Sequence, residues 1–266
     1  MPPTCAGAAK ARGASPAVAA ANPHTIVVLE TGGPVSMPWA DNVAAIVESW
    51  YPGIGGGQAI ANLLFGDVNF TAKLPVSFAK RDADLPHPEV AGIDLKPVPV
   101  VVDEHVAGKM VHRHEMKLPP FNVDYTEGAK VGYKWFEAQH IQPLFAFGHG
   151  LSYTTYEYSG LKLDDQGHEV TFSVKNTGTR PGAEIAQVYA ELPSSANEPF
   201  KRLVAFDRIP LAPGESKTVT LKIDPVLLSI FNVDKDGWDL LPGDYKILVG
   251  ASSEDTPLTA NLNIAK

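Results

Sequence analysis

The C-terminal half of the sequence alternates apolar and polar residues in short runs that end at turn residues. The run "HEVTFSVKNTG" spaces Val170, Phe172 and Val174 two positions apart and ends in Asn-Thr-Gly at 176–178. Successive side chains of a β-strand point to opposite faces, so this spacing predicts strands with one buried face. Short strands with turn signals every ~8–12 residues are typical of an antiparallel β-sandwich of about seven strands. We therefore predict such a sandwich over residues 151–266.

Further runs in this half fit the same sandwich. "AEIAQVYAEL" carries apolar residues at Ile185, Ala186 and Val188, and "GDYKILVGASS" alternates up to Val249. "LVAFDRIPLAPGESKTVTLKI" holds two apolar runs on either side of Pro213-Gly214. Because proline followed by glycine favours a turn, we expect these two runs to pair with each other as neighbouring strands.

The N-terminal part has a different pattern. Thr25–Leu29 is a short, continuous apolar run closed by Gly-Gly-Pro, which predicts a strand buried on both faces, as in a parallel sheet. The segment 39–49 predicts a helix, because it has apolar residues at helical spacing, namely Val43, Ile46 and Val47. The stretch "GGQAIANLLFG" repeats the helical pattern and ends at Gly66. Alternating strands and helices predict part of an α/β sandwich domain with a mostly parallel sheet over residues 17–85.

Two other segments lack regular periodicity. Residues 1–16 are rich in Ala, Gly and Pro, which predicts a disordered arm. Residues 86–150 carry many prolines and a stretch of charged residues and histidines. We interpret them as a long irregular connection with a hairpin around Val98–Val102.

Composition narrows the class of partner and the compartment. The chain of 266 residues is 44% apolar and 20% charged, as in globular proteins, and its formal net charge of -8 argues against nucleic acid or an anionic membrane as a partner. Its apolar runs are shorter than the roughly 20 residues that span a bilayer. Cys5 is the only cysteine, so no internal disulfide is expected. The N-terminus lacks the apolar core of a signal peptide, so we expect a cytoplasmic location as expressed.

The glycine cluster that follows Trp50 raises the question of phosphate binding. A phosphate loop requires a Lys and a Ser or Thr after its last glycine, but here Gly57 is followed by Gln58 and Ala59. The dinucleotide fingerprint fits only through Gly53 and Gly55, and no ribose-binding acid follows at the expected distance. We therefore expect a tight strand-to-helix turn and no cofactor.

A polar cluster in the connection raises the question of metal binding. Its members are Asp103, Glu104, His105, His112, His114 and Glu115. Two histidines at i and i+2 share a face of a strand and are suitable zinc ligands. The segment is polar and flanked by prolines, however, so we favour solvated side chains and expect no metal.

Two kinds of catalytic site were considered. Ser152 in "GHGLSY" does not fit the nucleophile elbow of serine hydrolases. Glycoside hydrolysis needs two carboxylic side chains on either side of the scissile bond. The least implausible acids for this role are Asp103, Glu104, Glu115 and Glu127, and we favour the interpretation of each as a surface acid.

Several stretches, taken in order, resemble one family. They are "ETGGPV", "WYPGIGGGQAIANLLFGDVN", "GYKWF", "FGHGLSYT" and "LPGDYKILVGASS". Over roughly residues 20–266 the chain is similar to the C-terminal half of glycoside hydrolase family 3 enzymes, typified by bacterial β-glucosidases and β-xylosidases. "GYKWF" followed by "FGHGLSYT" is the most specific part of this resemblance.

The resemblance implies an architecture and a function. It implies a barrel domain, then an α/β sandwich domain and a fibronectin-type-III-like domain, of which this chain holds part of the second and all of the third. The catalytic Asp would lie in the barrel and the acid/base Glu upstream of Thr25, so no catalytic residue is carried over and the catalytic residues are unknown. The substrate would be a β-glucoside-like carbohydrate. Intact family members are often periplasmic or secreted.

The incomplete sheet has a physical consequence, and other functions stay open. A parallel sheet without its first strands has an uncovered edge, so we expect a homodimer that covers the surface left by the missing barrel. One alternative is a non-enzymatic β-sandwich module that binds carbohydrate or protein. Its stacking faces would come from Trp39, Trp50, Trp135 and Trp238, although we favour core packing for these side chains. A nucleotide-binding protein is the third reading.

Overall fold

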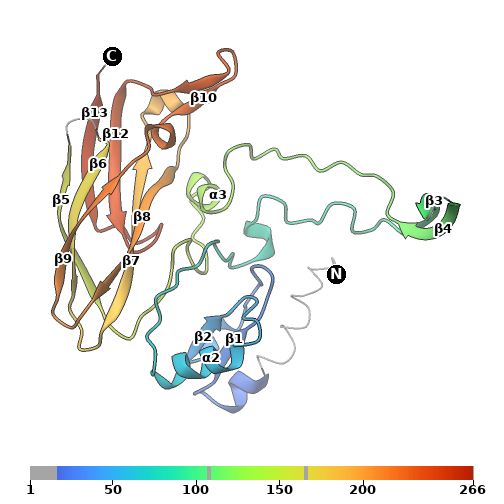
Figure 1. Cartoon of the computed structure of the whole chain (residues 1–266), viewed down its shortest axis with the longest axis horizontal. Coiled ribbons are helices and arrows are strands. Elements are labelled where there is room, and N and C mark those ends of the chain that lie inside the picture. Colours follow the sequence, from blue (N-terminus) through green and yellow to red (C-terminus); the bar gives the residue numbers. More distant parts are fainter. Residues whose placement is uncertain (1–16, 107–108, 165–166, 266) are drawn as a thin grey trace.

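The computed structural model describes residues 17–106, 109–164 and 167–265. The segment 1–16, for which we predicted disorder, lies outside the described residues together with Cys5. The described chain forms a β-sandwich, a small α/β unit, and a long connection from which a β-hairpin projects (Figure 1). No helix in these residues is both long and apolar enough to cross a lipid bilayer.

The sandwich consists of two antiparallel sheets with the predicted seven strands. The three-stranded sheet has the order β5-β6-β9, with β5 at Tyr156–Leu163, β6 at Glu169–Asn176 and β9 at Ser216–Lys222. The four-stranded sheet has the order β13-β12-β7-β8, with β13 at Leu258–Ile264, β12 at Gly243–Gly250, β7 at Gly182–Glu191 and β8 at Lys201–Leu211. Alternation in the sequence therefore predicted this fold correctly.

The core lies between the two sheets. Val170, Phe172 and Val174 are fully buried, as predicted, and pack with residues of the four-stranded sheet. On β7, Ala186 and Val188 enter the core, whereas Ile185 is only half-buried. The opposite face of β7 is also covered by the chain, so side chains on both faces of this strand are buried. Alternation of apolar and polar residues therefore does not indicate which side chains enter the core.

The two runs on either side of Pro213-Gly214 do not pair, which corrects the sequence interpretation. β8 pairs with β7, whereas β9 pairs with β6 in the opposite sheet. The chain therefore crosses from one sheet to the other at this turn. Both runs need to bury apolar side chains, and they do so from opposite sides of the same core, Leu211 from one sheet and Leu221 from the other.

Smaller elements complete the sandwich. β10 (Ile230–Asn232) and β11 (Gly237–Asp239) form a two-stranded hairpin beside it. Short 3-10 helices lie at Ser194–Ala196 and Pro225–Leu228. The second begins at Asp224, whose carboxylate accepts a hydrogen bond from the Val226 amide at 3.0 Å and so satisfies an otherwise free helical donor.

The α/β unit contains two parallel strands and one α-helix. β1 (Ile26–Leu29) pairs in parallel with β2 (Ala45–Glu48), as expected for the first strand. The predicted burial on both faces was wrong, because the sheet has only two strands and only Leu29 of β1 is buried. The helix predicted over 39–49 was wrong, because only a 3-10 turn at Ala40–Asn42 precedes β2. Isoleucine and valine at the centre of β2 are β-branched and favour a strand. Their apolar spacing also fits a helix, and the hydrogen bonds to β1 select the strand.

The helix after the glycine cluster was predicted correctly. α2 spans Gly56–Phe65 and ends at Gly66, which adopts the left-handed conformation with a φ of 80°. At its start, a Cβ on Gly56 would lie 2.6 Å from the Pro52 side chain, so the turn requires glycine there. The unit has a small core of Leu29, Met37, Trp39 and Phe78.

The connection contains more regular structure than its sequence indicates. A 3-10 turn at Asp82–Asp84 is followed by β3 (Val98–Val106) and β4 (Lys109–Lys117), which form an antiparallel hairpin. The predicted hairpin around Val98–Val102 is thus confirmed and is longer than expected. α3 (Tyr133–Ala138) then packs beside β8 of the sandwich.

Candidate functional site

The four carboxylates considered for catalysis lie on the hairpin and its stem. Asp103 is 2.6 Å from His112 Nδ1, and Glu104 is 3.2 Å from Arg113 Nε. On the same hairpin, Glu115 is 3.2 Å from Lys117 Nζ. Glu127 lies in the stem and contacts His87 Nε2 at 2.9 Å. Asp103, Glu104 and Glu115 therefore lie in exposed ion pairs, as expected for surface acids. The Glu127 side chain is only 5% exposed, so the interpretation as a surface acid is wrong for this residue.

The histidines of the polar cluster share a strand. His112 and His114 lie on the same face of β4, as their spacing predicts, and both are exposed. His105 lies on β3. Within residues 17–106, 109–164 and 167–265, no group of three or more His, Cys, Asp or Glu side chains is arranged to hold a metal ion.

The other sequence candidates have structural contacts. Ser152 donates a hydrogen bond to Asn69 Oδ1 at 3.0 Å and accepts one from the Thr154 amide, so its hydroxyl organises a loop. The glycine cluster is the turn into α2. Of the tryptophans, Trp39 is buried in the α/β core, and Trp50 and Trp135 are half-buried. Trp238 is 54% exposed on the β10–β11 hairpin.

The most developed polar site is the joint between the α/β unit and the sandwich. The segment 145–152, "FAFGHGLS", runs between them and bonds to both. Phe145 forms a β-bridge with Phe78, and the Leu74 amide donates to the His149 carbonyl at 2.8 Å. On the sandwich side, the Ser253 amide donates to the Phe147 carbonyl at 2.9 Å. The segment thus links the two parts through backbone hydrogen bonds.

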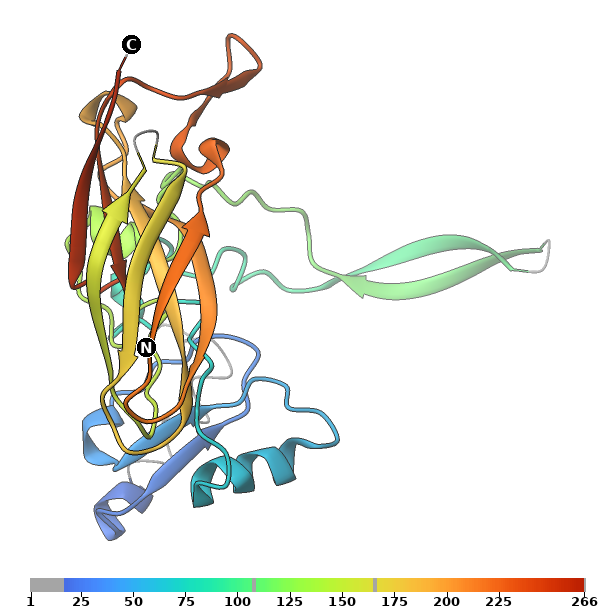
Figure 2. The ribbon, with the colours of Figure 1, turned by 60° about the vertical axis from the view of Figure 1, so that its left-hand side comes forward.

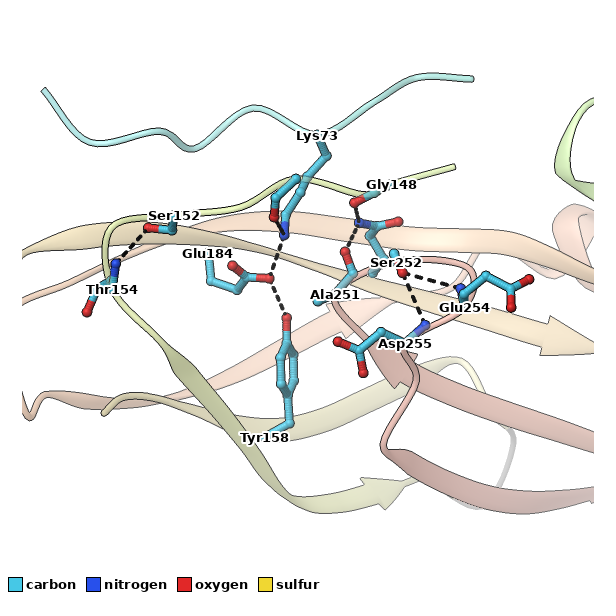
Figure 3. Close-up of polar contacts among 12 residues, drawn as sticks. Lys73, Gly148, Ser152, Thr154, Tyr158, Glu184, Ala251, Ser252, Glu254 and Asp255 are labelled. Carbon is cyan, nitrogen blue, oxygen red and sulfur yellow. Dashed lines mark hydrogen bonds and ion pairs between the residues drawn. The ribbon is translucent and has the colours of Figure 1, made fainter. Parts of the chain in front are cut away.

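A buried ion pair crosses this joint (Figure 3). Lys73 comes from the chain after α2, and its Nζ lies 3.1 Å from Oε1 of Glu184 on β7; the two side chains are 11% and 4% exposed. Tyr158 on β5 donates its hydroxyl to the same oxygen at 2.9 Å. Lys73 also donates to the Gly150 carbonyl at 3.2 Å. One lysine therefore ties the α/β unit to both sheets and to the segment 145–152.

Burial sets the protonation behaviour of this cluster. It raises the pKa of Glu184, and the opposing effects of Lys73 and of the Tyr158 hydroxyl do not fully cancel it. Burial also raises the pKa of Tyr158, and the neighbouring Glu184 adds to the rise. The pKa of His149 is lowered by burial and by the nearby Lys73. Desolvation disfavours the charged form in every case.

A second contact in the joint explains a required glycine. Gln187 donates to the Gly148 carbonyl at 3.2 Å and to the Ala251 carbonyl at 2.6 Å. Tyr189 donates to Gln187 Oε1 at 2.6 Å, so the buried amide is held on both sides. Gly148 has a φ of +79° and its hydrogen faces Gln187, where a Cβ would collide with the amide. This is the physical role of a glycine in "FGHGLSY".

The joint can position the two parts of the molecule relative to each other. Its side chains are buried and bonded to one another. Two hollows lie elsewhere on the described chain, one of about 300 Å³ near Phe206 and Lys222 and one of about 490 Å³ near Ala19 and Asp41. Neither is lined by two carboxylates, which is what glycoside hydrolysis needs.

Sequence reasoning missed the joint residues. Glu184 and Gln187 interrupt an otherwise apolar run on β7, and this interruption is the signal that could have found them. A polar residue in a buried strand requires a partner, since an unpaired buried charge is costly. The identity of that partner, Lys73, could not be read from the sequence because 111 positions separate it from Glu184.

The chain was compared with known protein families. Residues 12–153 match the sequence model of the glycosyl hydrolase family 3 C-terminal domain. Residues 184–253 match that of the fibronectin type III-like domain.

Proteins with similar sequences are named β-glucosidases. The chain is 37% identical over 254 residues to a β-glucosidase of Rhizobium radiobacter, which covers 93% of this chain and 28% of that protein. It is 40% identical over 247 residues to β-glucosidase B of Emericella nidulans, covering 90% of this chain and 27% of the relative. The chain thus spans little more than a quarter of the length of these relatives.

Solved structures of β-glucosidases are similar to this chain. A β-glucosidase from Streptomyces venezuelae in complex with D-glucose superposes with a TM-score of 0.75 at 36% identity, covering 94% of this chain and 30% of that one. β-Glucosidase 3B from Thermotoga neapolitana in complex with α-D-glucose gives a TM-score of 0.74 at 32% identity, over 91% of this chain and 31% of that one.

Proposed function

The chain belongs to glycoside hydrolase family 3, as a C-terminal portion of that architecture, and from this premise we propose that the intact protein is a β-glucosidase. It would hydrolyse terminal β-glycosidic bonds of glucoside-like carbohydrates. The observation that carries the proposal is the match along 93% of the chain to a protein named β-glucosidase. A glucose-bound structural neighbour supports the same substrate class.

Within the proposed enzyme, this portion would support the catalytic domain. We assign residues 17–85 to a partial α/β sandwich domain, 86–150 to the connection and 151–266 to the fibronectin-type-III-like domain. The family's catalytic Asp and Glu would lie outside this chain. The Lys73–Glu184 pair supports a positioning role, because it fixes the orientation of the two domains on which a barrel would rest.

A chimera tests the proposed activity. The corresponding C-terminal portion of the Rhizobium radiobacter β-glucosidase would be replaced by residues 17–266 of this chain. We expect a folded chimera that hydrolyses p-nitrophenyl β-glucoside, because the two portions are 37% identical and share a fold. A folded, monodisperse chimera without activity would count against the proposal.

The chain alone tests where the catalytic groups lie. We expect no turnover of p-nitrophenyl β-glucoside by the isolated chain. If turnover appears, alanine substitution of Asp103, Glu104, Glu115 and Glu127 identifies its source. Turnover that these substitutions abolish would contradict the assignment of the catalytic pair to regions outside this chain.

A second candidate function is carbohydrate binding without catalysis. Trp238 and Phe231 lie opposite each other across the β10–β11 ladder, with ring centroids 5.5 Å apart. Both rings are about half exposed, and exposed tryptophan rings are suitable for stacking on sugars. Affinity electrophoresis in soluble β-glucan, compared with Trp238→Ala, would detect such binding. Unchanged mobility in wild type would reject it.

We also propose that a second copy of the chain covers the open side of the α/β unit. β1 and β2 form a sheet of only two strands, and Ile26 on β1 is half-exposed. Free edges of parallel strands readily pair with another strand. Small-angle scattering should then report a dimer, and Ile26→Lys should weaken it.

A further inference from the structure

Helix α2 carries apolar side chains on most of its sides, yet it belongs to neither hydrophobic core of the described chain. Its ten residues include no charged side chain. Ile60, Leu63 and Leu64 are half-buried and Phe65 is 86% exposed. None of them joins the core of the sandwich or that of the α/β unit, and α2 makes no extensive contact with another described helix or strand. Because helices in proteins are stabilised mainly by packing of an apolar face, α2 needs another means of attachment.

The chain is fixed just before α2 and then becomes rich in glycine. The Trp50 side chain packs against the α/β core, and a Cβ on Gly32 would collide with the Tyr51 hydroxyl, so both aromatic residues hold the start of the turn. Gly53 follows with a φ of 68°, and four of the five residues 53–57 are glycine. Since glycine restricts backbone rotation least, the chain can bend here while Trp50 stays in place.

The C-terminal end of α2 is bonded to the sandwich by a set of contacts that we call the latch, made by the side chains of Asn69, Tyr153 and Arg180. Tyr153 donates its hydroxyl hydrogen bond to the Leu63 carbonyl, in the last turn of α2, at 2.8 Å. The Arg180 guanidinium lies over the Tyr153 ring, 5.6 Å from its centroid, and a Cβ on Gly66 would lie 3.0 Å from the same guanidinium. A cation beside the last carbonyls of a helix interacts favourably with the helix dipole.

Asn69 completes the latch just after α2. Its Nδ2 donates to the Pro181 carbonyl at 3.0 Å. Its Oδ1 accepts hydrogen bonds from the Ser152 hydroxyl at 3.0 Å and from the Tyr153 amide at 2.8 Å. One side chain thus ties the chain after α2 to two separate loops of the sandwich. Figure 2 shows the same arrangement, with α2 standing apart from β1 and β2 and its C-terminal end directed toward the sandwich.

Beyond the latch the chain is fixed again at Lys73, which forms the buried ion pair with Glu184. Residues 53–72 therefore run between two fixed points, Trp50 in the α/β core and Lys73 in the joint. Between these points α2 has no apolar core of its own, so the latch is what holds it in place. A segment with few buried apolar contacts is the kind that opens locally while the rest of a protein stays folded.

We propose that residues 53–68, here called the strap, form a hinged element that the sandwich holds closed through the latch. When the strap opens, α2 moves away by bending at the glycines, while β1, β2 and the two fixed points keep their places. The sandwich, and not the sheet that precedes α2 in the sequence, then sets the position of this helix. Tyr153 and Asn69 are positioning residues for α2 across the boundary between the two parts. The proposal concerns the chain itself and does not depend on the proposed activity.

Hydrogen exchange of the full chain, measured by mass spectrometry, tests the latch. Tyr153→Phe removes only the hydroxyl that bonds Leu63 and keeps the ring. Loss of one hydrogen bond typically shifts an equilibrium about fivefold, so we expect the α2 amides to exchange about fivefold faster as a group. Asn69→Ala removes three hydrogen bonds and should speed their exchange at least about tenfold. The amides of β1, β2 and the sandwich strands should keep their wild-type rates.

Tyr245→Phe is the matched control, because the Tyr245 hydroxyl also donates to a backbone carbonyl at 2.8 Å, that of Leu241 within the sandwich. It should leave the exchange of α2 unchanged. Three results would overturn the proposal. They are α2 amides that exchange in wild type as fast as in an unfolded peptide, equal α2 rates in Tyr153→Phe and Tyr245→Phe, or equal acceleration of α2, β1 and β2, which would mean that the α/β unit opens as a whole. Tyr153→Phe decides between these results by itself if Asn69→Ala does not fold.

Discussion

The β-sandwich and the α/β unit differ in how they bury their apolar side chains. The sandwich encloses a continuous core between two sheets, and Val170, Phe172 and Val188 in it have no exposed surface. The α/β unit has a two-stranded sheet and a core of four buried apolar residues. On its helix α2, only Gly56 is buried and Phe65 is 86% exposed. The sandwich is thus complete in itself, whereas the α/β unit has apolar surface left for a neighbour.

The largest expected loss of stability comes from a substitution in the sandwich core. Phe172→Ala should lower the free energy of unfolding by about 3–5 kcal/mol, because the removed ring leaves a cavity in a closed core. Leu29→Ala in the α/β unit should cost less, since that core is small and next to solvent. Urea unfolding would measure both, followed by far-UV circular dichroism and by tryptophan fluorescence in a Trp135→Phe, Trp238→Phe background, where the remaining Trp39 and Trp50 report on the α/β unit. Equal costs would show that the α/β core is as closed as the sandwich.

The joint tests whether the two parts unfold together. Lys73→Met removes the positive partner of a buried carboxylate and should destabilise the folded chain by about 3 kcal/mol. It should also separate the unfolding transitions of the two parts. The matched control is Lys217→Met, whose lysine lies in an exposed pair with Glu215 and should have an effect below about 1 kcal/mol. A single unchanged transition in Lys73→Met would mean that the ion pair does not couple the domains.

The loss of stability caused by Lys73→Met should be smaller at acidic pH. Because the pKa of Glu184 is raised in the folded state, folding takes up a proton there, and its stability contribution decreases as pH rises above 4.5, the ordinary value. Without Lys73 that pKa rises further. The destabilisation by Lys73→Met should therefore be smaller near pH 5 than near pH 8. Urea titrations at both pH values, with Glu184→Gln as the variant that abolishes the difference, would check this.

The smallest effect is expected on α2. Phe65→Ser should change the free energy of unfolding by less than about 0.5 kcal/mol in this chain, because the ring is already in solvent. Thermal unfolding would measure it. A large loss of stability would indicate that a second copy or another surface already covers α2 in solution.

Prediction from the sequence succeeded where the apolar residues of a segment fitted only one kind of secondary structure. Period two on β6 predicted a strand and its buried face, and Gly66 marked the end of α2 correctly. It failed for residues 39–49, where apolar residues fit a helix but pairing with β1 selects a strand. It failed again at Pro213-Gly214, because a turn does not specify which sheet the next strand joins.

The sequence by itself determined the class of each part and the family, because alternation, turn residues and the stretch "FGHGLSYT" are local signals. The tertiary structure alone decided the joint and the latch. Lys73, Tyr158 and Glu184 meet because two sheets and a connecting segment converge, and no local pattern encodes that meeting. The contact of Tyr153 with Leu63 likewise depends on where the sandwich meets α2. Long-range packing determines both, since burial is a property of the whole fold.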